Sequence, residues 1–246
     1  MSQFPAQSGA PIDARDARVG DMPVYVAKPA HSVQAPILIV VAEIFGLNDH
    51  IRDVVRRFAA EGYLAIAPDF FFRIGDPSKE HDIAAIRAIV MKVPDAQAMQ
   101  DFDAALAFAS SLGGDAARAA ITGFCWGGRM AWLYAAHNPK LRAVVPWYGR
   151  LDGDRTENQP RWPIDVADRI SVPALGLYGG ADPSIPLELV EKMRARLAVA
   201  PAPAEILVYP NAPHAFFADY RESYRKEAAR DAFARMLAFL KAQGAA

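Results

Sequence analysis

One short segment places a cysteine between glycines in a spacing that is typical of an enzyme nucleophile. Residues 123–128 read Gly-Phe-Cys-Trp-Gly-Gly, which fits the pattern glycine, any residue, nucleophile, any residue, glycine. The apolar run before the cysteine predicts a strand over 119–124, and the residues after it predict a helix over 127–137. In that context the turn presents the thiol of Cys125 at a helix N-terminus, where the helix dipole and free N–H groups stabilise a thiolate.

The tight turn also assigns a function to the backbone of Trp126. Such a turn holds the nucleophile in a strained conformation, and only small residues fit two positions before and two positions after it. The N–H of Trp126 would then form one half of an oxyanion hole. The alternative is that Cys125 is an inert, buried thiol, which is the usual state of a free cysteine. The strand and helix that flank the motif favour the nucleophile.

Two further side chains follow predicted strands in the order nucleophile, acid, histidine, which this type of site requires. Asp182 comes after the predicted strand at 174–178, and His214 lies in the loop after the strand at 205–209. In a Cys–His pair the histidine accepts the thiol proton, and an aspartate fixes the imidazole tautomer and stabilises its cation. Asp182 could instead form a turn, and His214 could be an ordinary loop residue. The other four histidines follow no core strand, so His214 is the predicted base.

The elements that must position these residues alternate between strands and helices. The predicted strands cover 22–27, 37–42, 63–67, 119–124, 143–148, 174–178 and 205–209, and the predicted helices cover 48–61, 80–91, 95–112, 127–137, 186–197 and 220–242. This alternation predicts a mostly parallel central sheet with helices on both faces, and ligands bind at the carboxyl ends of such strands. With the nucleophile motif, it predicts a single α/β-hydrolase domain over 1–246. About residues 1–20 are expected to be an irregular lead-in, or else an edge strand.

The composition excludes several other classes of protein. The chain has 246 residues, of which 52% are hydrophobic, so it can bury a sizeable core. Its 27 basic and 28 acidic residues give a net charge of −1, which provides no electrostatic case for nucleic acid or an anionic membrane as partner. No apolar run has the length of a signal peptide or a membrane span. A single cysteine excludes an intramolecular disulfide and favours a reducing compartment, so we expect a cytoplasmic protein.

The same inventory argues against a metal centre. With one cysteine and no two histidines at ligand spacing, the sequence predicts neither a metal ion nor another cofactor. The expected partner is a small-molecule ester or lactone, and the expected assembly is a monomer or small homo-oligomer.

Four segments together resemble the dienelactone hydrolase (carboxymethylenebutenolidase) family, and the resemblance runs from about residue 22 to the C-terminus. They are Glu-Ile-Phe-Gly-Leu at 43–47, Gly-Phe-Cys-Trp-Gly-Gly-Arg at 123–129, Gly-Gly-Ala-Asp at 179–182 and Pro-His-Ala-Phe at 213–216. The resemblance implies that Glu43 contacts the resting thiol and takes part in forming the thiolate. It also implies that the backbone N–H of Ile44 forms the other half of the oxyanion hole. Without the resemblance, Glu43 would be interpreted as a surface or helix-entry residue.

The resemblance further implies an anionic unsaturated lactone as substrate, in the degradation of aromatic compounds. Arginines hold the substrate carboxylate in this family, and Arg73 resembles one of them. The second would follow the histidine, where this chain departs from the pattern and has Phe-Phe-Ala at 216–218. Arg221 is nearby but not aligned, and the segment 149–170, with Arg150, Arg161 and Trp162, could supply a substitute. Trp147 and Tyr148, with Trp126 and Trp162, are expected to line the pocket, although aromatic residues more often lie in the core.

Three functions are therefore compared. The first is a carboxylic ester hydrolase that opens a dienelactone through the Cys125 thiolate and a thioester intermediate. The second is a carboxylesterase or thioesterase of the same fold with a different acid pocket, which the missing second arginine favours. The third is a non-catalytic ligand-binding or thiol-sensing protein. A sensor needs only the thiol, so the presence of Cys125, Asp182, His214 and Glu43 together argues against the third.

Overall fold

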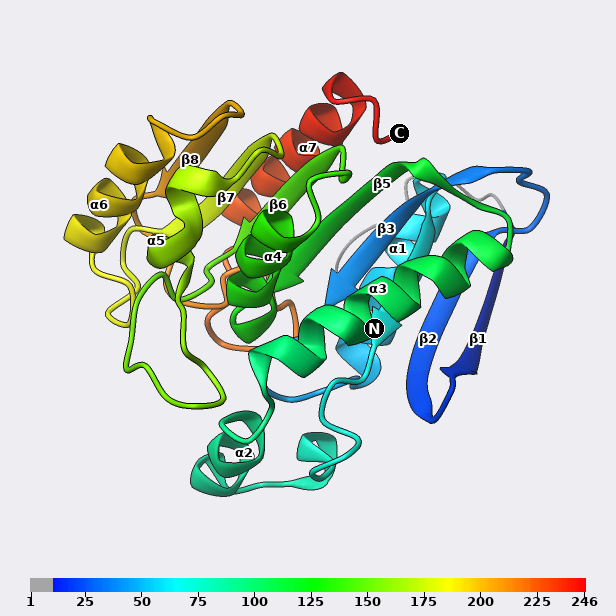
Figure 1. Cartoon of the computed structure of the whole chain (residues 1–246), viewed down its shortest axis with the longest axis horizontal. Helices are drawn as coiled ribbons and strands as arrows, with labels where there is room; N and C mark the ends of the chain where they lie inside the picture. The colour runs from blue at the N-terminus through cyan, green and yellow to red at the C-terminus, as the bar shows by residue number, and fades with distance from the viewer. Residues whose placement is uncertain (1–10) are drawn as a thin grey trace.

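The computed structural model describes residues 11–246, which form one eight-stranded sheet with helices on both of its faces (Figure 1). The strands lie in the order β1-β2-β4-β3-β5-β6-β7-β8. The pairs β1/β2 and β2/β4 run antiparallel, and every other neighbouring pair runs parallel. The predicted mostly parallel sheet is confirmed.

The elements have the following bounds. The strands are β1 Ile12–Val19, β2 Met22–Pro29, β3 Ala35–Val41, β4 Leu64–Pro68, β5 Gly114–Phe124, β6 Ala143–Trp147, β7 Ala174–Gly179 and β8 Ala204–Tyr209. The α-helices are α1 Asp49–Ala60, α2 Ile83–Val90, α3 Asp95–Ser111, α4 Trp126–His137, α5 Pro163–Val166, α6 Leu187–Leu197 and α7 Lys226–Ala242. Two short 3₁₀ helices cover Pro77–Lys79 and Ala167–Arg169.

The core lies between the sheet and its two layers of helices. In Figure 1, α3 and α4 lie in front of the sheet, and α1 and α7 lie behind it. Every residue of β3 is buried, as expected for an apolar, β-branched strand that is covered on both faces. Asn48 caps α1 by accepting a hydrogen bond from the N–H of Ile51, which satisfies one of the free amides at the helix start.

Three differences between the predicted and the observed boundaries are the largest. The lead-in is not irregular over 12–19, because this segment forms β1, the edge strand that was the alternative; residues 1–10 lie outside the described residues. β5 begins at Gly114 rather than at Ala119, since its first residues continue the pairing with β3 although their side chains are small or polar. The closing helix begins at Lys226 rather than at Tyr220.

Tertiary contacts explain why the segment before α7 is a loop and not part of the helix. The side chains of Phe216 and Phe217 are fully buried, which draws the chain into the core. The carboxylate of Asp219 then pairs with two side chains of α1, the Nδ1 of His50 at 3.2 Å and the guanidinium of Arg57 at 2.6 Å. These contacts hold the loop against α1, and helical geometry becomes possible only after Arg225.

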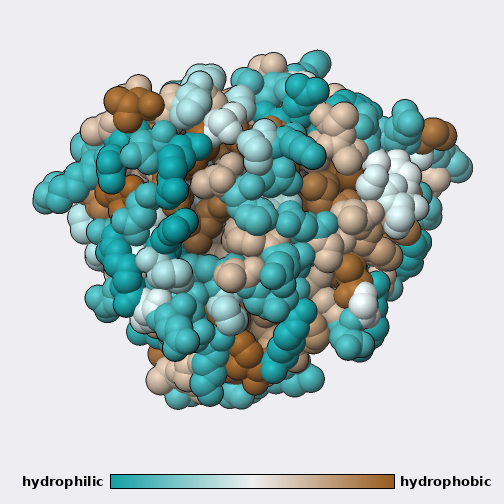
Figure 2. All heavy atoms as spheres, in the orientation of Figure 1, coloured by the Kyte–Doolittle hydropathy of each residue, from teal (hydrophilic) through white to brown (hydrophobic). Residues whose placement is uncertain are grey.

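The hydropathy of the surface is mixed on the visible face of the molecule. On the face drawn in Figure 2, hydrophilic residues predominate and hydrophobic ones occur in small groups between them. Within residues 11–246, no helix combines the length and apolar character that crossing a bilayer requires.

Candidate active site

Cys125 lies between β5 and α4 in the strained conformation that the sequence predicts. Its φ is 55° and its ψ is −113°, and its backbone N–H donates to the carbonyl of Trp147 at 3.0 Å. A side chain on Gly123 would overlap the carbonyl of Gly127, and a side chain on Gly127 would overlap the carbonyl of Val41. The packing of backbone against backbone therefore requires both glycines, and the turn presents the thiol at the first residue of α4.

His214 and Asp182 lie together at the carboxyl end of the sheet, next to Cys125. The Nδ1 of His214 is 2.6 Å from Oδ2 of Asp182, whose side chain is buried. The other carboxylate oxygen of Asp182 accepts hydrogen bonds from the hydroxyl of Ser184 at 2.6 Å and from its N–H at 2.8 Å. Asp182 therefore forms a turn and holds the histidine at the same time, and Nε2 is the nitrogen left to face the thiol.

The charges of these groups depend on one another. Burial by itself lowers the pKa of His214, but hydrogen bonds to Asp182 and Cys125, together with their negative charges, raise that pKa to about 10. Burial by itself raises the pKa of Asp182, and the hydrogen bond and positive charge of His214 outweigh it, so that this pKa is lowered. The arrangement favours the protonated form of the imidazole between Asp182 and Cys125.

This coupling predicts how the stability of the protein varies with pH. The pKa of His214 is raised from 6.5 to about 10 in the folded state, so protonation of the ring stabilises the fold fully below about pH 6.5. That contribution is lost as the pH rises through about 10. We expect the difference in unfolding free energy between the wild type and His214→Gln, measured by urea denaturation, to shrink between about pH 6 and about pH 10. A difference that does not vary with pH would contradict this assignment of charge.

Glu43 is a buried acid directly after β3, with an exposed fraction of 2%. Its Oε2 accepts a long hydrogen bond of 3.4 Å from the hydroxyl of Tyr220, and its Oε1 has no hydrogen-bond partner among residues 11–246. No hydrogen bond joins Glu43 to the thiol of Cys125 within that range. Glu43 therefore lies inside the molecule rather than on its surface, and a tyrosine holds it.

A cavity of about 630 Å³ opens over the thiol. The residues that line it are Ile44, Phe45, Ile83, Arg87, Val90, Met91, Cys125, Trp126, Arg129, Arg150, Gln159, Trp162, Asp182, Pro183, Ser184, His214 and Arg221. Ile44 and Trp126, the two residues predicted to provide the oxyanion hole, line this cavity together with Cys125. The N–H of Trp126 has no acceptor within α4, because it belongs to the first turn of the helix.

Two of the predicted pocket aromatics lie elsewhere. Trp147 has no exposed surface, donates its indole N–H to Thr122 and packs in the core, so it does not line the cavity. Tyr148 is 1% exposed and is not among the residues that line the cavity, and its ring lies edge-on to His214 at a centroid distance of 5.2 Å. Both follow or end a core strand, where burial favours aromatic residues, whereas Trp126 and Trp162 do line the cavity.

The arginines are also arranged differently from the prediction. The guanidinium of Arg73 forms two hydrogen bonds, 2.7 and 2.9 Å long, with the carboxylate of Asp101, and Arg73 is not part of the cavity wall. Arg87, Arg150 and Arg221 line the cavity instead, and no ion pair joins any of the three to an acid among the described residues. Arg87 could not be identified from the sequence, because an exposed arginine on the short helix α2 belongs to no motif.

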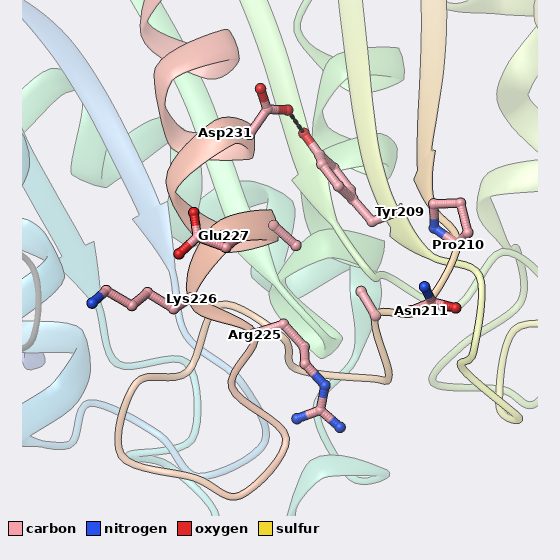
Figure 3. A pocket seen from close by; sticks show the side chains of 9 residues that line it. Tyr209, Pro210, Asn211, Arg225, Lys226, Glu227 and Asp231 are labelled. Carbon is pink, nitrogen blue, oxygen red and sulfur yellow. Dashed lines mark hydrogen bonds between the residues drawn. The ribbon is translucent and has the colours of Figure 1, made fainter.

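A second hollow, of about 450 Å³, lies at the end of β8 and the start of α7 (Figure 3). Its wall includes Tyr209, whose hydroxyl donates to Asp231 at 2.8 Å, and the side chains of Arg225 and Lys226. Its wall contains no cysteine, serine, threonine or histidine, so the cavity over Cys125 is the candidate active site. Within the described residues, no three His, Cys, Asp or Glu side chains are grouped so as to hold a metal ion.

Comparison with known proteins agrees with this geometry. A protein of Salmonella typhimurium strain LT2 named "Putative carboxymethylenebutenolidase" is 55% identical over 226 residues, which cover 91% of this chain and 84% of the relative. A Bradyrhizobium protein named "Probable 2-oxo-3-(5-oxofuran-2-ylidene)propanoate lactonase" is 32% identical over 222 residues, 88% of each chain. The crystal structure described as "Putative Dienelactone Hydrolase" from Klebsiella pneumoniae has a TM-score of 0.92 at 52% identity and covers 94% of this chain and 99% of its own.

These similarities confirm the predicted resemblance and the predicted α/β-hydrolase fold. The family model described as "Dienelactone hydrolase family" matches residues 22–244, nearly the whole of the chain. The chain belongs to the dienelactone hydrolase family and is a hydrolase of ester or lactone bonds.

Proposed function

We propose that this hydrolase opens an anionic, unsaturated lactone through the thiolate of Cys125, in the degradation of aromatic compounds. His214 takes the thiol proton, and the sulfur attacks the lactone carbonyl. The N–H groups of Ile44 and Trp126 bind the oxyanion of the tetrahedral intermediate. When the ring C–O bond breaks, the enolate remains attached to the acyl group, and Cys125 carries a thioester that water then hydrolyses.

The charge of the cavity is the observation that supports an anionic substrate. Arg87, Arg150 and Arg221 line it without an acidic partner among the described residues. The fourth arginine of the wall, Arg129, is neutralised by two hydrogen bonds of 2.7 Å to Asp95. A cavity with several free guanidinium groups favours a substrate that bears a carboxylate.

Two features narrow the substrate further. The name of the Bradyrhizobium relative denotes a lactone that carries a propanoate, which is an anion of this kind. The volume of about 630 Å³ suits a small molecule rather than a polymer chain. Both features favour a small lactone that carries a carboxylate over a large neutral ester.

A comparison of two substrates in arginine variants tests this proposal. Arg87→Gln and Arg221→Gln each remove one cation from the cavity, and we expect each to lower kcat/KM for a dienelactone by about 10- to 100-fold, mainly through KM. Hydrolysis of neutral p-nitrophenyl acetate should change by less than about threefold, since this ester has no carboxylate to lose contact with.

Arg73→Gln is the matched control. Its guanidinium is bound to Asp101 outside the cavity, so the same chemical change there should leave both activities within about twofold of the wild type. If the cavity variants lose both activities equally, the arginines support the fold rather than the substrate. If they lose neither, the enzyme is an esterase with a different preference, the second function that the sequence left open.

A further inference from the structure

Near the nucleophile lie two buried oxygen atoms that have no hydrogen-bond partner among the described residues. One is Oε1 of Glu43 and the other is the hydroxyl of Tyr148. Both side chains are almost completely buried, at 2% and 1% exposed. A buried polar atom without a hydrogen-bond partner destabilises the fold, and a bound water or ligand can supply the missing partner.

The backbone shows that the position of Tyr148 is enforced. Its φ is 37°, a conformation that residues other than glycine rarely adopt, and its N–H donates to the carbonyl of Leu177 at 2.8 Å. The preceding residue, Trp147, accepts the hydrogen bond from the N–H of Cys125. The hydrogen bond between Cys125 and Trp147 therefore lies next to both strained residues, the nucleophile and this tyrosine. Backbone strain of this kind is common at active sites.

The surroundings of the tyrosine are those of the reaction centre. Its ring lies edge-on to His214 at 5.2 Å, and the rings of Phe124 and Phe216 pack against it. Burial raises the pKa of the Tyr148 hydroxyl well above its usual range, and the charges of Glu43 and Cys125 raise it further. The hydroxyl is thus neutral and lies in the electrostatic field of both groups.

We infer that Tyr148 and Glu43 bind the water molecule that hydrolyses the thioester. This inference rests on the proposed function, because it needs an acyl group on Cys125. The oxygen of the water attacks the thioester carbonyl carbon, and one of its protons passes to Nε2 of His214. The C–S bond then breaks, the carboxylic acid leaves, and the sulfur departs as the thiolate that the imidazolium stabilises.

The remaining hydrogen bonds of the water fit the two free oxygens. Oε1 of Glu43 can accept a hydrogen bond from the water, and the tyrosine hydroxyl can donate to the water oxygen. Together they would fix the water at a defined position beside the acyl carbon, which replaces a random encounter by a prearranged one. Tyr148 is then a catalytic residue for deacylation alone, and acylation does not use it.

The variant Tyr148→Phe tests this assignment, because it removes one oxygen atom and retains the packed ring. With p-nitrophenyl acetate, we expect steady-state turnover to fall by about 10- to 100-fold. The acetyl-enzyme, trapped in acid and weighed by mass spectrometry, should accumulate on Cys125 to a higher fraction than in the wild type. Hydroxylamine, which attacks a thioester without a prepared water, should restore turnover more in the variant than in the wild type.

Tyr134→Phe is the control, since its buried hydroxyl binds Asp103 near the far end of α4. If Tyr148→Phe turns over more slowly but accumulates no more acetyl-enzyme than the wild type, the inference is overturned, because acylation is then the step affected. Absence of acetyl-enzyme from both the wild type and the variant, even after trapping, would overturn the proposed Cys125 mechanism itself. The two failures are therefore distinguishable.

A crystal structure of the wild type provides a second test that needs no variant. We expect an ordered water within hydrogen-bond distance of both the Tyr148 hydroxyl and Oε1 of Glu43. A direct hydrogen bond between these two side chains, with no space for water, would overturn the inference.

Discussion

Replacing Cys125 by alanine is expected to lower kcat/KM for any ester or lactone substrate by about 10⁴-fold or more. The thiolate supplies the bond-forming atom, and the residual activity of such variants comes from the oxyanion hole and binding alone. Steady-state hydrolysis by purified wild type and variant measures the loss. Because Cys125 is the single cysteine of the chain, labelling with iodoacetamide should also disappear in the variant.

The control for this loss is the integrity of the fold. The side chain of Cys125 is only partly buried, so the variant should unfold within about 1 kcal/mol of the wild type. A stable variant that retains most of its activity would mean that another group attacks the substrate. That result would contradict the assignment of Cys125 as the nucleophile and would favour the alternative that its thiol is inert.

Asp182→Asn is expected to lower kcat by about 10³- to 10⁴-fold. In related Ser-His-Asp sites the same change turns the histidine to the wrong tautomer while the geometry stays intact. Here Oδ2 accepts from Nδ1 of His214 at 2.6 Å, and an amide would place a donor or a weaker acceptor at that point. The pH–rate profile should shift as well, since the pKa of His214 depends on the carboxylate.

Ser184→Ala separates the two functions of Asp182. It removes the hydrogen bond from the hydroxyl to Oδ1, keeps the one from the backbone N–H of the same residue, and leaves Oδ2 with the histidine. We expect kcat to fall by less than about tenfold. Equal losses in Asp182→Asn and Ser184→Ala would show that Asp182 acts by supporting the loop and not by holding the imidazole.

The catalytic part of the site was predictable because its physical requirements appear in the sequence. A tight turn between a parallel strand and a helix needs glycines on both sides of the nucleophile, and the backbone overlaps at Gly123 and Gly127 show why. Residues that follow parallel strands meet at one edge of the sheet. That rule predicts that Asp182 and His214 lie close to Cys125.

The substrate-binding part was not predictable from the sequence, because loops and short helices decide it. Arg87 lies on α2, which stands away from the sheet in Figure 1, and nothing in its spacing indicates which way the side chain points. Arg73 was chosen by resemblance, but the nearby carboxylate of Asp101 binds it. Trp147 and Tyr148 are predicted to line the cavity, but both rings are buried in the apolar core.

The loop after His214 shows the same limit. Its apolar and helix-compatible residues predict a helix from 220, but the ion pairs of Asp219 with α1 hold it as a loop. Such a contact joins segments more than 150 residues apart and leaves no local pattern. As a consequence Tyr220, which donates to Glu43, was not predicted as part of the site.

The most direct test of the account is the steady-state hydrolysis of cis- and trans-dienelactone beside p-nitrophenyl acetate by the wild-type protein. We expect kcat/KM for at least one dienelactone to exceed that for the neutral ester by about 100-fold or more, since the cavity arginines and the thiolate act together. Comparable or lower values for both dienelactones would contradict it and would assign the cavity to a different acyl substrate.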